Sequence, residues 1–373
     1  MRCLSRMLRN PQQGAHAGLG PRRSCRRLAV ALVAALLGLV AAAPTAQAAP
    51  CDTPANEIVA ENCNAGAASG DWEISGAGNQ DMQGFAADIS VNQGETARFK
   101  VDAGATPFRI DIYRLGWYGG QGARYRATAS QPSPTSSQPA CTTESATGLY
   151  ECGNWSVSAT WAVPASATSG LYLGVVKTAN GTPQSHIAFV VRDDDGRSDL
   201  LFQTSDTTWQ AYNSYGGNSL YTGSPAGRAY KVSYDRPFAT AGGTGEDWLF
   251  NSEYPMIRWL ERNGFDVSYF TGVDSDRLGA EIREHKAFLS VGHDEYWSGG
   301  QRANVEAARN AGVDLAFFSG NEVFWKTRWE DNHRTLVSYK ETHAGAKIDP
   351  LPNVWTGTWR DPRFSPPADG GRP

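Results

Sequence analysis

The sequence contains no cysteine after Cys152, although the chain runs to 373 residues. This absence excludes a thiol nucleophile and a thiolate metal site from the C-terminal part of the chain. Beyond residue 48 there are four cysteines, which form two closely spaced pairs: Cys51, Cys63, Cys141 and Cys152. In an oxidising compartment this spacing predicts two local disulfides, 51–63 and 141–152.

Common catalytic motifs are missing as well. The sequence has no G-x-S-x-G nucleophile elbow, no P-loop and no H-E-x-x-H motif, and no G-x-G-x-x-G follows the first strand expected in the C-terminal half. Histidine is scarce there, and no two of its four histidines have ligand spacing on one expected helix: His285, His293, His333 and His343. A zinc site is therefore not expected.

The first 48 residues contain seven Arg and no acidic residue. An apolar run, 28-LAVALVAALLGLVAAA-43, is followed by the small-x-small triplet 46-AQA-48. This order is typical of a cleaved secretory signal, and the apolar run is short for a membrane span. We therefore predict a secreted protein that has no membrane attachment after cleavage. Arg22-Arg23 leaves both the Sec and the twin-arginine export routes open.

Loss of the signal changes the charge balance. Without residues 1–48, 27 basic residues face 38 acidic ones, which gives a net charge of −11. Such an acidic chain argues against nucleic acid and anionic membrane surfaces as partners.

Residues 49–195 predict a β-sandwich. Short runs that alternate in polarity or are rich in β-branched residues are separated by Gly, Pro, Asn and Ser, as in immunoglobulin- or fibronectin-like modules. No helical periodicity of useful length interrupts them. The expected strands are 86–91, 96–101, 108–115, 155–163, 171–176 and 186–191.

Residues 198–373 predict an α/β domain after the polar junction 192-RDDDGRS-198. Alternating apolar strands and helices are typical of a mostly parallel sheet covered by helices on both faces. The expected strands are 199–204, 266–271, 287–291 and 314–319, and the expected helices are 246–264, 275–284 and 299–312.

Polar side chains follow three of these strands. The first strand leads into Ser205-Asp206, the third into 292-GHDEYW-297, and the fourth into 320-GNEVFW-325. Because ligands bind at the carboxyl ends of parallel strands, we expect His293, Glu295 and Asn321 to meet in one crevice if their strands are neighbours.

Structural roles are the alternative for the same residues. Asp294 or Glu295 can cap the helix near residue 299, and Asn321 can form an ordinary turn. Trp297 and Trp325 are typical packing residues.

Oxygen donors are abundant near these strand ends. Phenolate and carboxylate are hard ligands that suit a trivalent metal, in practice ferric iron, which also lowers the pKa of a phenol. The phenols are Tyr212, Tyr215, Tyr221, Tyr234 and Tyr254.

The chain resembles the large subunit of N,N-dimethylformamidase and the wider family named after its C-terminal domain. The resemblance covers about residues 70–365. The phrases that carry it are 112-IYRLGWYGGQGAR-124, 159-ATWAVPASATSGLYLG-174, 209-WQAYNSYGG-217, 232-VSYDRP-237, 257-IRWLERNGFDVSY-269, 292-GHDEYW-297 and 320-GNEVFWK-326. It implies an α/β domain like that of class I glutamine amidotransferases, without the cysteine nucleophile.

The resemblance also implies hydrolysis of a small amide at a mononuclear iron held by two tyrosines and a glutamate. Carried over to this sequence, Glu295 and Tyr212 are the expected ligands, with Tyr234 as the second tyrosine and Tyr254 as its competitor. Three further residues are expected to line the site or move protons: His293, Asn321 and Lys340.

Two features set this chain apart from the family. It ends at 369-DGGRP-373, where the family's domain is expected to continue, which predicts a C-terminal truncation, and its export signal is unusual for amide catabolism. A truncated pseudo-enzyme and a secreted binding protein for carbohydrate or peptide are therefore alternatives to an amidase. The expected partners are a small amide substrate and, as a further option, other copies of the chain.

Overall fold

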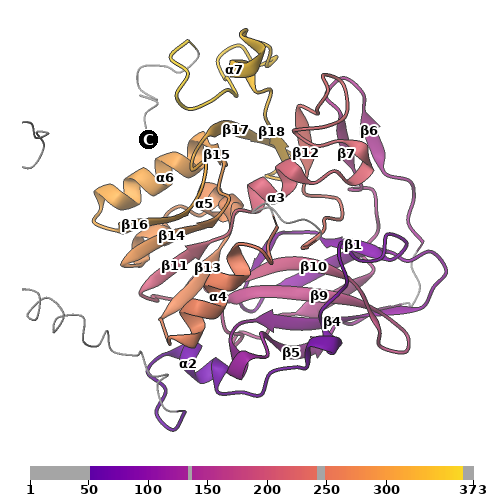
Figure 1. Ribbon diagram of the computed structural model, residues 1–373, viewed down its shortest axis with the longest axis vertical. Helices are drawn as coiled ribbons and strands as arrows, with labels where there is room; N and C mark the ends of the chain where they lie inside the picture. Colours follow the sequence, from indigo (N-terminus) through magenta and orange to yellow (C-terminus); the bar gives the residue numbers. More distant parts are fainter. Residues whose placement is uncertain (1–50, 133–136, 242–247, 364–373) are drawn as a thin grey trace, which may run out of the picture. The chain divides into compact units, whose positions relative to one another are not determined.

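The computed structural model describes residues 51–132, 137–241 and 248–363 (Figure 1). The expected export signal at 1–48 and the last ten residues lie outside these ranges. Within them, no helix is long and apolar enough to cross a membrane.

Two sheets near the N-terminus pack against each other (Figure 1). Between ring centroids, Phe99 of the smaller sheet lies 5.4 Å and Trp161 lies 6.2 Å from Phe189 of the larger sheet. The order in the smaller sheet is β1 (Gln83–Ala86), β3 (Thr96–Asp102), β8 (Ala159–Ala162). The order in the larger is β2 (Ser90–Asn92), β10 (Pro183–Arg192), β9 (Gly170–Thr178), β4 (Phe108–Leu115), β5 (Ala123–Thr128).

The larger sheet is buried on its second face as well. Leu173 and Val190 on that face share a hydrophobic core with Ile257, Leu260 and Leu289 from the C-terminal half. The strands β9 and β10 are therefore apolar on both sides, which explains their continuous runs of buried residues.

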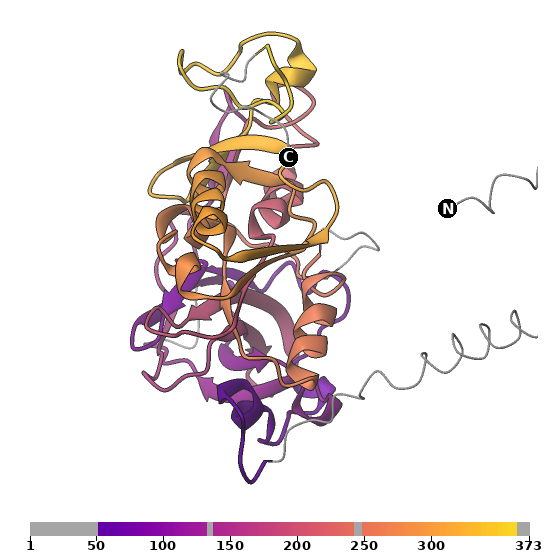
Figure 2. The ribbon, with the colours of Figure 1, turned by 90° about the vertical axis from the view of Figure 1, so that its left-hand side faces the viewer.

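A four-stranded parallel sheet carries the strand ends that the sequence singled out. Its order is β13 (Val267–Phe270), β11 (Leu200–Gln203), β14 (Ala287–Gly292), β16 (Asp314–Ser319). Leu289 contributes to the core beneath α4 (Glu253–Arg262), and its neighbour Phe288 contributes to the core beneath α6 (Gly299–Asn310). Since successive strand residues face opposite ways, α4 and α6 lie on opposite faces of this sheet (Figure 2).

The remaining elements build smaller units. A four-stranded mixed sheet has the order β12 (Lys231–Ser233), β18 (Thr335–Val337), β17 (Trp325–Glu330), β15 (Tyr296–Ser298), and β6 (Thr142–Glu144) pairs with β7 (Leu149–Glu151). The short helices are α2 (Glu57–Asn62), α3 (Asp206–Tyr212), α5 (Gly272–Arg277) and α7 (Glu341–Ala344), and single 3₁₀ turns lie at Ser69–Asp71, Tyr118–Gly120, Tyr215–Gly217 and Glu281–Glu284.

The predicted class I glutamine amidotransferase-like α/β domain is wrong. The structure is mostly β, with several small mixed or antiparallel sheets and few helices. Only α4 and α6 exceed seven residues among the described helices, and after β16 the chain continues in β17 and β18, which pair antiparallel instead of adding helix-linked parallel strands. Strand β16 is not covered as the apolar pattern predicted: Phe317 is 45% and Phe318 52% exposed.

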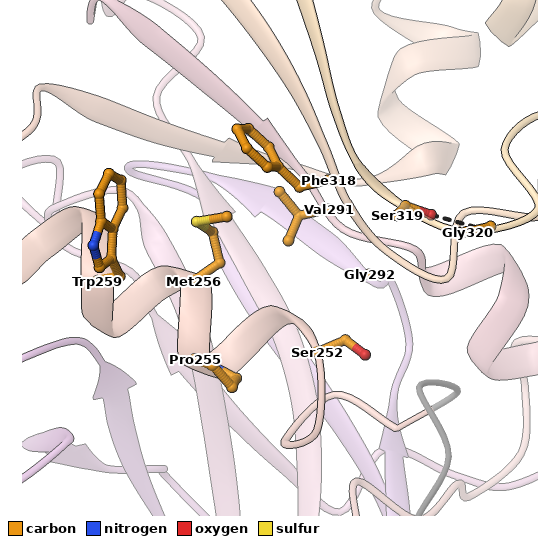
Figure 3. Close-up of a pocket in the computed structure, with 9 residues that line it drawn as sticks. All are labelled: Ser252, Pro255, Met256, Trp259, Val291, Gly292, Phe318, Ser319 and Gly320. Carbon is orange, nitrogen blue, oxygen red and sulfur yellow. Dashed lines mark hydrogen bonds between the residues drawn. The ribbon is translucent and has the colours of Figure 1, made fainter. Parts of the chain in front are cut away.

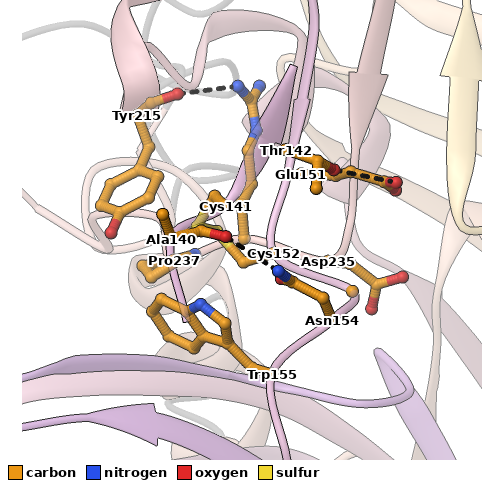
Figure 4. The surroundings of a disulfide bond; sticks show 12 residues. Ala140, Cys141, Thr142, Glu151, Cys152, Asn154, Trp155, Tyr215, Asp235 and Pro237 are labelled. Carbon is orange, nitrogen blue, oxygen red and sulfur yellow. Dashed lines mark hydrogen bonds between the residues drawn. A yellow bond between two sulfur atoms is a disulfide. The ribbon is translucent and has the colours of Figure 1, made fainter. Parts of the chain in front are cut away.

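Both predicted disulfides are confirmed, Cys51–Cys63 and Cys141–Cys152. The second joins the two ends of the β6–β7 hairpin (Figure 4). Beside it, the backbone N–H of Cys152 donates to the carbonyl of Asp235, after β12, at 2.6 Å. Trp155 and Phe85 pack beside it and keep Cys152 fully buried.

Candidate functional site

The site begins where β14 ends at Gly292. This glycine has φ +96°, a backbone conformation that residues with a Cβ rarely adopt. A Cβ there would lie 2.5 Å from Ser205 Oγ and 2.6 Å from Glu253 Oε1. The chain therefore needs glycine at this point to turn out of the sheet and place His293 and Glu295 beyond it.

Both backbone groups of Glu295, its N–H and its carbonyl, are hydrogen-bonded to other segments. Its N–H donates to Thr208 Oγ1 at 3.1 Å, and its carbonyl accepts from the N–H groups of Phe324 and Trp325 at 3.0 and 2.9 Å. The following residue, Tyr296, pairs with Trp325 in the β15–β17 ladder. The carboxyl group thus projects from backbone that is fixed by two other segments.

The Glu295 carboxylate accepts hydrogen bonds from two phenols and an indole. Its Oε2 accepts from Tyr212 OH at 3.1 Å and from Tyr221 OH at 2.8 Å, and its Oε1 accepts from Trp325 Nε1 at 3.1 Å. Tyr296 OH donates to Tyr221 OH at 2.7 Å. Only 4% of Glu295 is exposed, whereas Tyr221 is 39% exposed, so the group of oxygens opens to solvent on the Tyr221 side. Burial, followed by the Glu295 charge, raises the pKa of Tyr221.

His293 and Asn321 meet across neighbouring strands. Because β14 pairs with β16, the turns that follow these strands are adjacent. Asn321 Nδ2 lies 3.2 Å from His293 Nε2, which is 3.7 Å from Glu295 Oε2. Asn321 has φ +54°, in the left-handed region, which asparagine adopts more readily than most residues with a side chain.

Lys340 approaches the same group from the segment after β18. Its Nζ lies 3.5 Å from the centroid of the Tyr221 ring and 4.9 Å from that of Trp325. Burial lowers the pKa of Lys340 to about 7, and the attraction of Glu295 opposes this shift. Lys340 can therefore gain and lose a proton near neutral pH.

The structure does not bring Tyr234 or Tyr254 to Glu295. Tyr234 OH donates to Asp206 Oδ2 at 2.8 Å, at the start of α3. Tyr254 lies in an aromatic cluster, with ring centroids 6.1 Å from Trp72 and 5.0 Å from Phe250.

Tyr221, in contrast, lies beside Tyr212 and Glu295. Sequence reasoning counted Tyr221 among the phenols but gave it no role. A signal was available, because two glycines, Gly216 and Gly217, lie between Tyr212 and Tyr221 and allow the chain to fold back. Leu220 N–H indeed donates to Ala211 O at 2.9 Å, which places the residues that follow, Tyr212 and Tyr221, side by side.

Asp294 does not cap a helix. Ser298 caps α6 through Gln301 N–H, while Asp294 is fully buried and its Oδ2 accepts from Gln203 Nε2 at 2.6 Å and from Ser290 Oγ at 2.7 Å. Burial, followed by the nearby Glu322 charge, raises its pKa well above the usual range.

Glu253 lies beneath Gly292 as the first residue of α4. Its Oε1 accepts from Ser205 N–H at 3.2 Å, from Ser205 Oγ and from Trp209 Nε1 at 2.9 Å. Its Oε2 is buried and has no hydrogen-bond partner among the described residues. Burial raises the pKa of Glu253 to about 7, and the hydrogen bonds from Ser205 oppose the shift.

The free energy of unfolding is expected to fall as the pH rises, because the buried Glu253 carboxyl then loses its proton. The folded chain binds the Glu253 proton more tightly than the unfolded chain, so this stabilisation is full below the unfolded pKa and is lost as the pH rises to about 7. The loss attributable to Glu253 is about 3 kcal/mol. Glu253→Gln keeps the acceptor oxygen without the charge, so we expect it to unfold at a higher temperature than wild type at pH 8 but not at pH 5.

Thermal unfolding of both proteins between pH 5 and 8 checks this expectation. Glu73→Gln, at an exposed position, is the matched control and should give a difference from wild type that does not vary with pH. An equally pH-independent difference for Glu253→Gln would contradict the prediction.

An open apolar groove adjoins the site on the α4 face of the sheet (Figure 3). Met256 and Trp259 of α4 form one wall, and Val291 and Phe318 form the other, around a cavity of ≈ 750 Å³. The end of the groove nearest the site contains Gly292 and Gly320, which directly precede His293 and Asn321. Trp259 and Phe318 are both about half exposed, at 53% and 52%.

The donor set fits a hard cation better than a soft one. Across the described ranges, no three His, Cys, Asp or Glu side chains cluster in a way that could hold a metal ion. The hydroxyls of Tyr212 and Tyr221 beside Glu295 form a set of oxygen donors of another kind. Oxygen separations of 2.8 and 3.1 Å are also those of neighbouring ligands around one small, hard cation.

Comparison with known proteins places this site in a family. Residues 109–370 match the family described as N,N-dimethylformamidase beta subunit-like, C-terminal. The chain belongs to this family. The match begins in β4, so it includes β4, β5, β9 and β10 of the larger N-terminal sheet and the whole candidate site.

One curated relative is the N,N-dimethylformamidase beta subunit of Alcaligenes sp. It is 30% identical over 122 residues, which cover 30% of this chain and 16% of the relative. The aligned stretch is thus a small part of that protein.

Proposed function

We propose that this chain is an exported hydrolase that cleaves the C–N bond of a small amide, with Tyr212, Tyr221 and Glu295 as the ligands of a ferric ion. One observation carries the proposal: two phenol hydroxyls converge on a single oxygen of a buried carboxylate. Family membership supports an activity related to that of N,N-dimethylformamidase. The two disulfides and the sequence of residues 1–48 support export.

The ferric ion would supply Lewis acidity that polarises the amide carbonyl and acidifies a bound water. The chain's own residues divide the remaining tasks. Trp325 holds the second Glu295 oxygen and so fixes the direction in which the first one points. Asn321 keeps the His293 ring in place and, being exposed, can donate a hydrogen bond to the substrate oxygen.

Lys340 and His293 are the proton carriers in this proposal. Hydrolysis requires the attacking water to lose a proton and the leaving nitrogen to gain one as the C–N bond breaks. Lys340 has its pKa lowered to about 7 by burial and can do both at neutral pH. His293 lies 3.7 Å from Glu295 Oε2, on the side of Asn321, and can relay the same proton.

A visible absorption band from tyrosinate bound to iron tests the proposal. We expect the purified whole chain to contain iron and to show this band, and Glu295→Ala to lose both, together with at least about a 100-fold loss of amine release from small formamides. Tyr221→Phe should weaken the band, because one of its two phenols is gone. Tyr254→Phe is the matched control and should keep the band, since Tyr254 lies in the aromatic cluster with Trp72 and Phe250.

Three results would decide against it. A folded wild-type chain that binds no iron and has no band would exclude the proposed metal site. Loss of the band in Tyr234→Phe but not in Tyr221→Phe would assign the second phenol to Tyr234. Retained binding of a carbohydrate or peptide by Glu295→Gln, without iron, would favour a binding protein.

A further inference from the structure

Arg236 is a buried cation with no carboxylate partner among the described residues. It is fully buried, and burial lowers its pKa to about 9, so it stays protonated at neutral pH. Its neighbour Asp235 instead accepts from Arg334 Nη2 at 2.7 Å. A buried charge is costly unless other groups stabilise it, and in the described part of the chain backbone carbonyls do so.

The Arg236 guanidinium binds four backbone carbonyls of one segment. Nη2 donates to the carbonyls of Gln210 and Asn213 at 3.3 and 2.9 Å, at the C-terminal end of α3. Nη1 donates to the carbonyls of Tyr215 and Asn218 at 3.0 and 2.8 Å. The rigid fork of a guanidinium suits this arrangement, because each of its ends serves two oxygens.

These four carbonyls lie between or directly beside the two phenols of the candidate site. Gln210 precedes Tyr212 by two residues, and Asn218 precedes Tyr221 by three. The backbone hydrogen bond from Leu220 N–H to Ala211 O joins the two ends of this segment. The Arg236 guanidinium binds the carbonyls that lie between these ends.

We infer that Arg236 is a positioning residue for the phenol pair: it fixes the segment from Gln210 to Asn218 so that Tyr212 and Tyr221 both reach Glu295. The inference rests on the proposed role of these phenols. The phrase 232-VSYDRP-237 then braces α3 at both ends, with Tyr234 on Asp206 at the start of the helix and Arg236 on the carbonyls at its end.

The test uses Arg236→Lys in the whole chain, because lysine keeps the charge but lacks the fork. In the metal-free protein, we expect hydrogen exchange over residues 206–222 to become faster, by about tenfold or more at the Leu220 amide. In ferric titrations, we expect the affinity to fall about 10–100-fold and the tyrosinate band to weaken. Arg236→Met should show larger effects of the same kind if it folds.

Two control variants separate positioning from general destabilisation. Arg334→Lys changes an arginine that contacts Asp235 and Ala86 but not the braced segment, and it should leave exchange and affinity at wild-type values. Arg114→Lys lowers stability far from the segment and should also keep the affinity for iron.

The outcomes distinguish this inference from the proposed function. Wild-type exchange at Leu220 in folded Arg236→Lys would overturn the inference whether or not iron binds. Equal losses of affinity in Arg236→Lys and Arg114→Lys would overturn it too, because stability alone would then explain them. Absence of iron in wild type, with exchange altered only in Arg236→Lys, would overturn the proposed function while keeping the bracing role.

Discussion

Replacing Arg114 by methionine is expected to lower the free energy of unfolding by about 3–5 kcal/mol. Arg114 and Glu261 form an ion pair in which both side chains are fully buried, with Nη2–Oε1 and Nη1–Oε2 distances of 2.8 and 3.0 Å. Burial alone would lower the pKa of Arg114, but the Glu261 charge raises it well above its usual value. Methionine would leave the Glu261 carboxylate buried without its cation, and this uncompensated charge accounts for most of the loss.

Urea or guanidinium unfolding of both proteins measures this loss. Lys286→Met is the matched control, since it breaks an exposed pair with Asp199 and is expected to change stability by less than about 1 kcal/mol. The double variant Arg114→Met with Glu261→Gln removes both charges, so it should be less destabilised than the sum of the two single changes. A loss for Arg114→Met no larger than that of Lys286→Met would contradict the prediction.

The Arg114–Glu261 pair connects two motifs that lie far apart in the sequence. Arg114 lies in 112-IYRLGWYGG-120 on β4, and Glu261 lies in 257-IRWLERNG-264 on α4. Arg114 further binds the carbonyl of Ser169 and the hydroxyl of Tyr118, and Tyr269 donates to Glu261. These two phrases therefore connect the larger N-terminal sheet to the helix beside the site, a role that sequence inspection did not assign.

Sequence patterns predicted local structure better than fold class. Cysteine spacing alone sufficed for the disulfides, because both join residues close in the chain. The alternation of apolar strands and helices predicted a parallel α/β domain, and the family resemblance implied an amidotransferase-like one. Periodicity does not show how short the helices are or which strands pair antiparallel. The apolar run at 314–319 was expected to be a covered strand, and instead it is the exposed edge β16.

The candidate site shows the same limit at the level of residues. The turn after β14 pointed to His293 and Glu295 because their strand end was visible in the sequence. Tyr221 was harder to assign, since it reaches Glu295 only through the fold of the segment after α3. Tyr234 was chosen from its phrase, yet the contact that decides its place, with Asp206, joins two segments whose pairing no spacing rule predicts.

Gly292→Ala is expected to destabilise the chain by about 2–5 kcal/mol. Two costs add up at this position. The first is backbone strain, because alanine at φ +96° is disfavoured by about 1–2 kcal/mol. The second is a collision, because the new Cβ would lie 2.5 Å from Ser205 Oγ and 2.6 Å from Glu253 Oε1, both of which are buried.

Gly312→Ala separates these two costs. Gly312 has φ +102°, but a Cβ there would meet no atom within 4 Å, so this variant carries only the strain. Denaturant unfolding should therefore give a loss for Gly292→Ala at least about twice that for Gly312→Ala. Similar losses for the two variants would show that the buried Ser205 and Glu253 side chains can move away from the new Cβ without lowering the free energy of unfolding. The collision argument would then fail.

Removing the nearest obstacle tests the same argument from the other side. Ser205→Ala deletes the hydroxyl that lies closest to the new Cβ and that also donates to Glu253. If the collision matters, Gly292→Ala in this background should cost about 1–2 kcal/mol less than it does in wild type. Gly292 directly precedes His293 and lies three residues before Glu295, so strain at this turn should also displace Glu295. We therefore expect Gly292→Ala to weaken the tyrosinate band of the proposed iron site, and Ser205→Ala in the same chain to restore part of it.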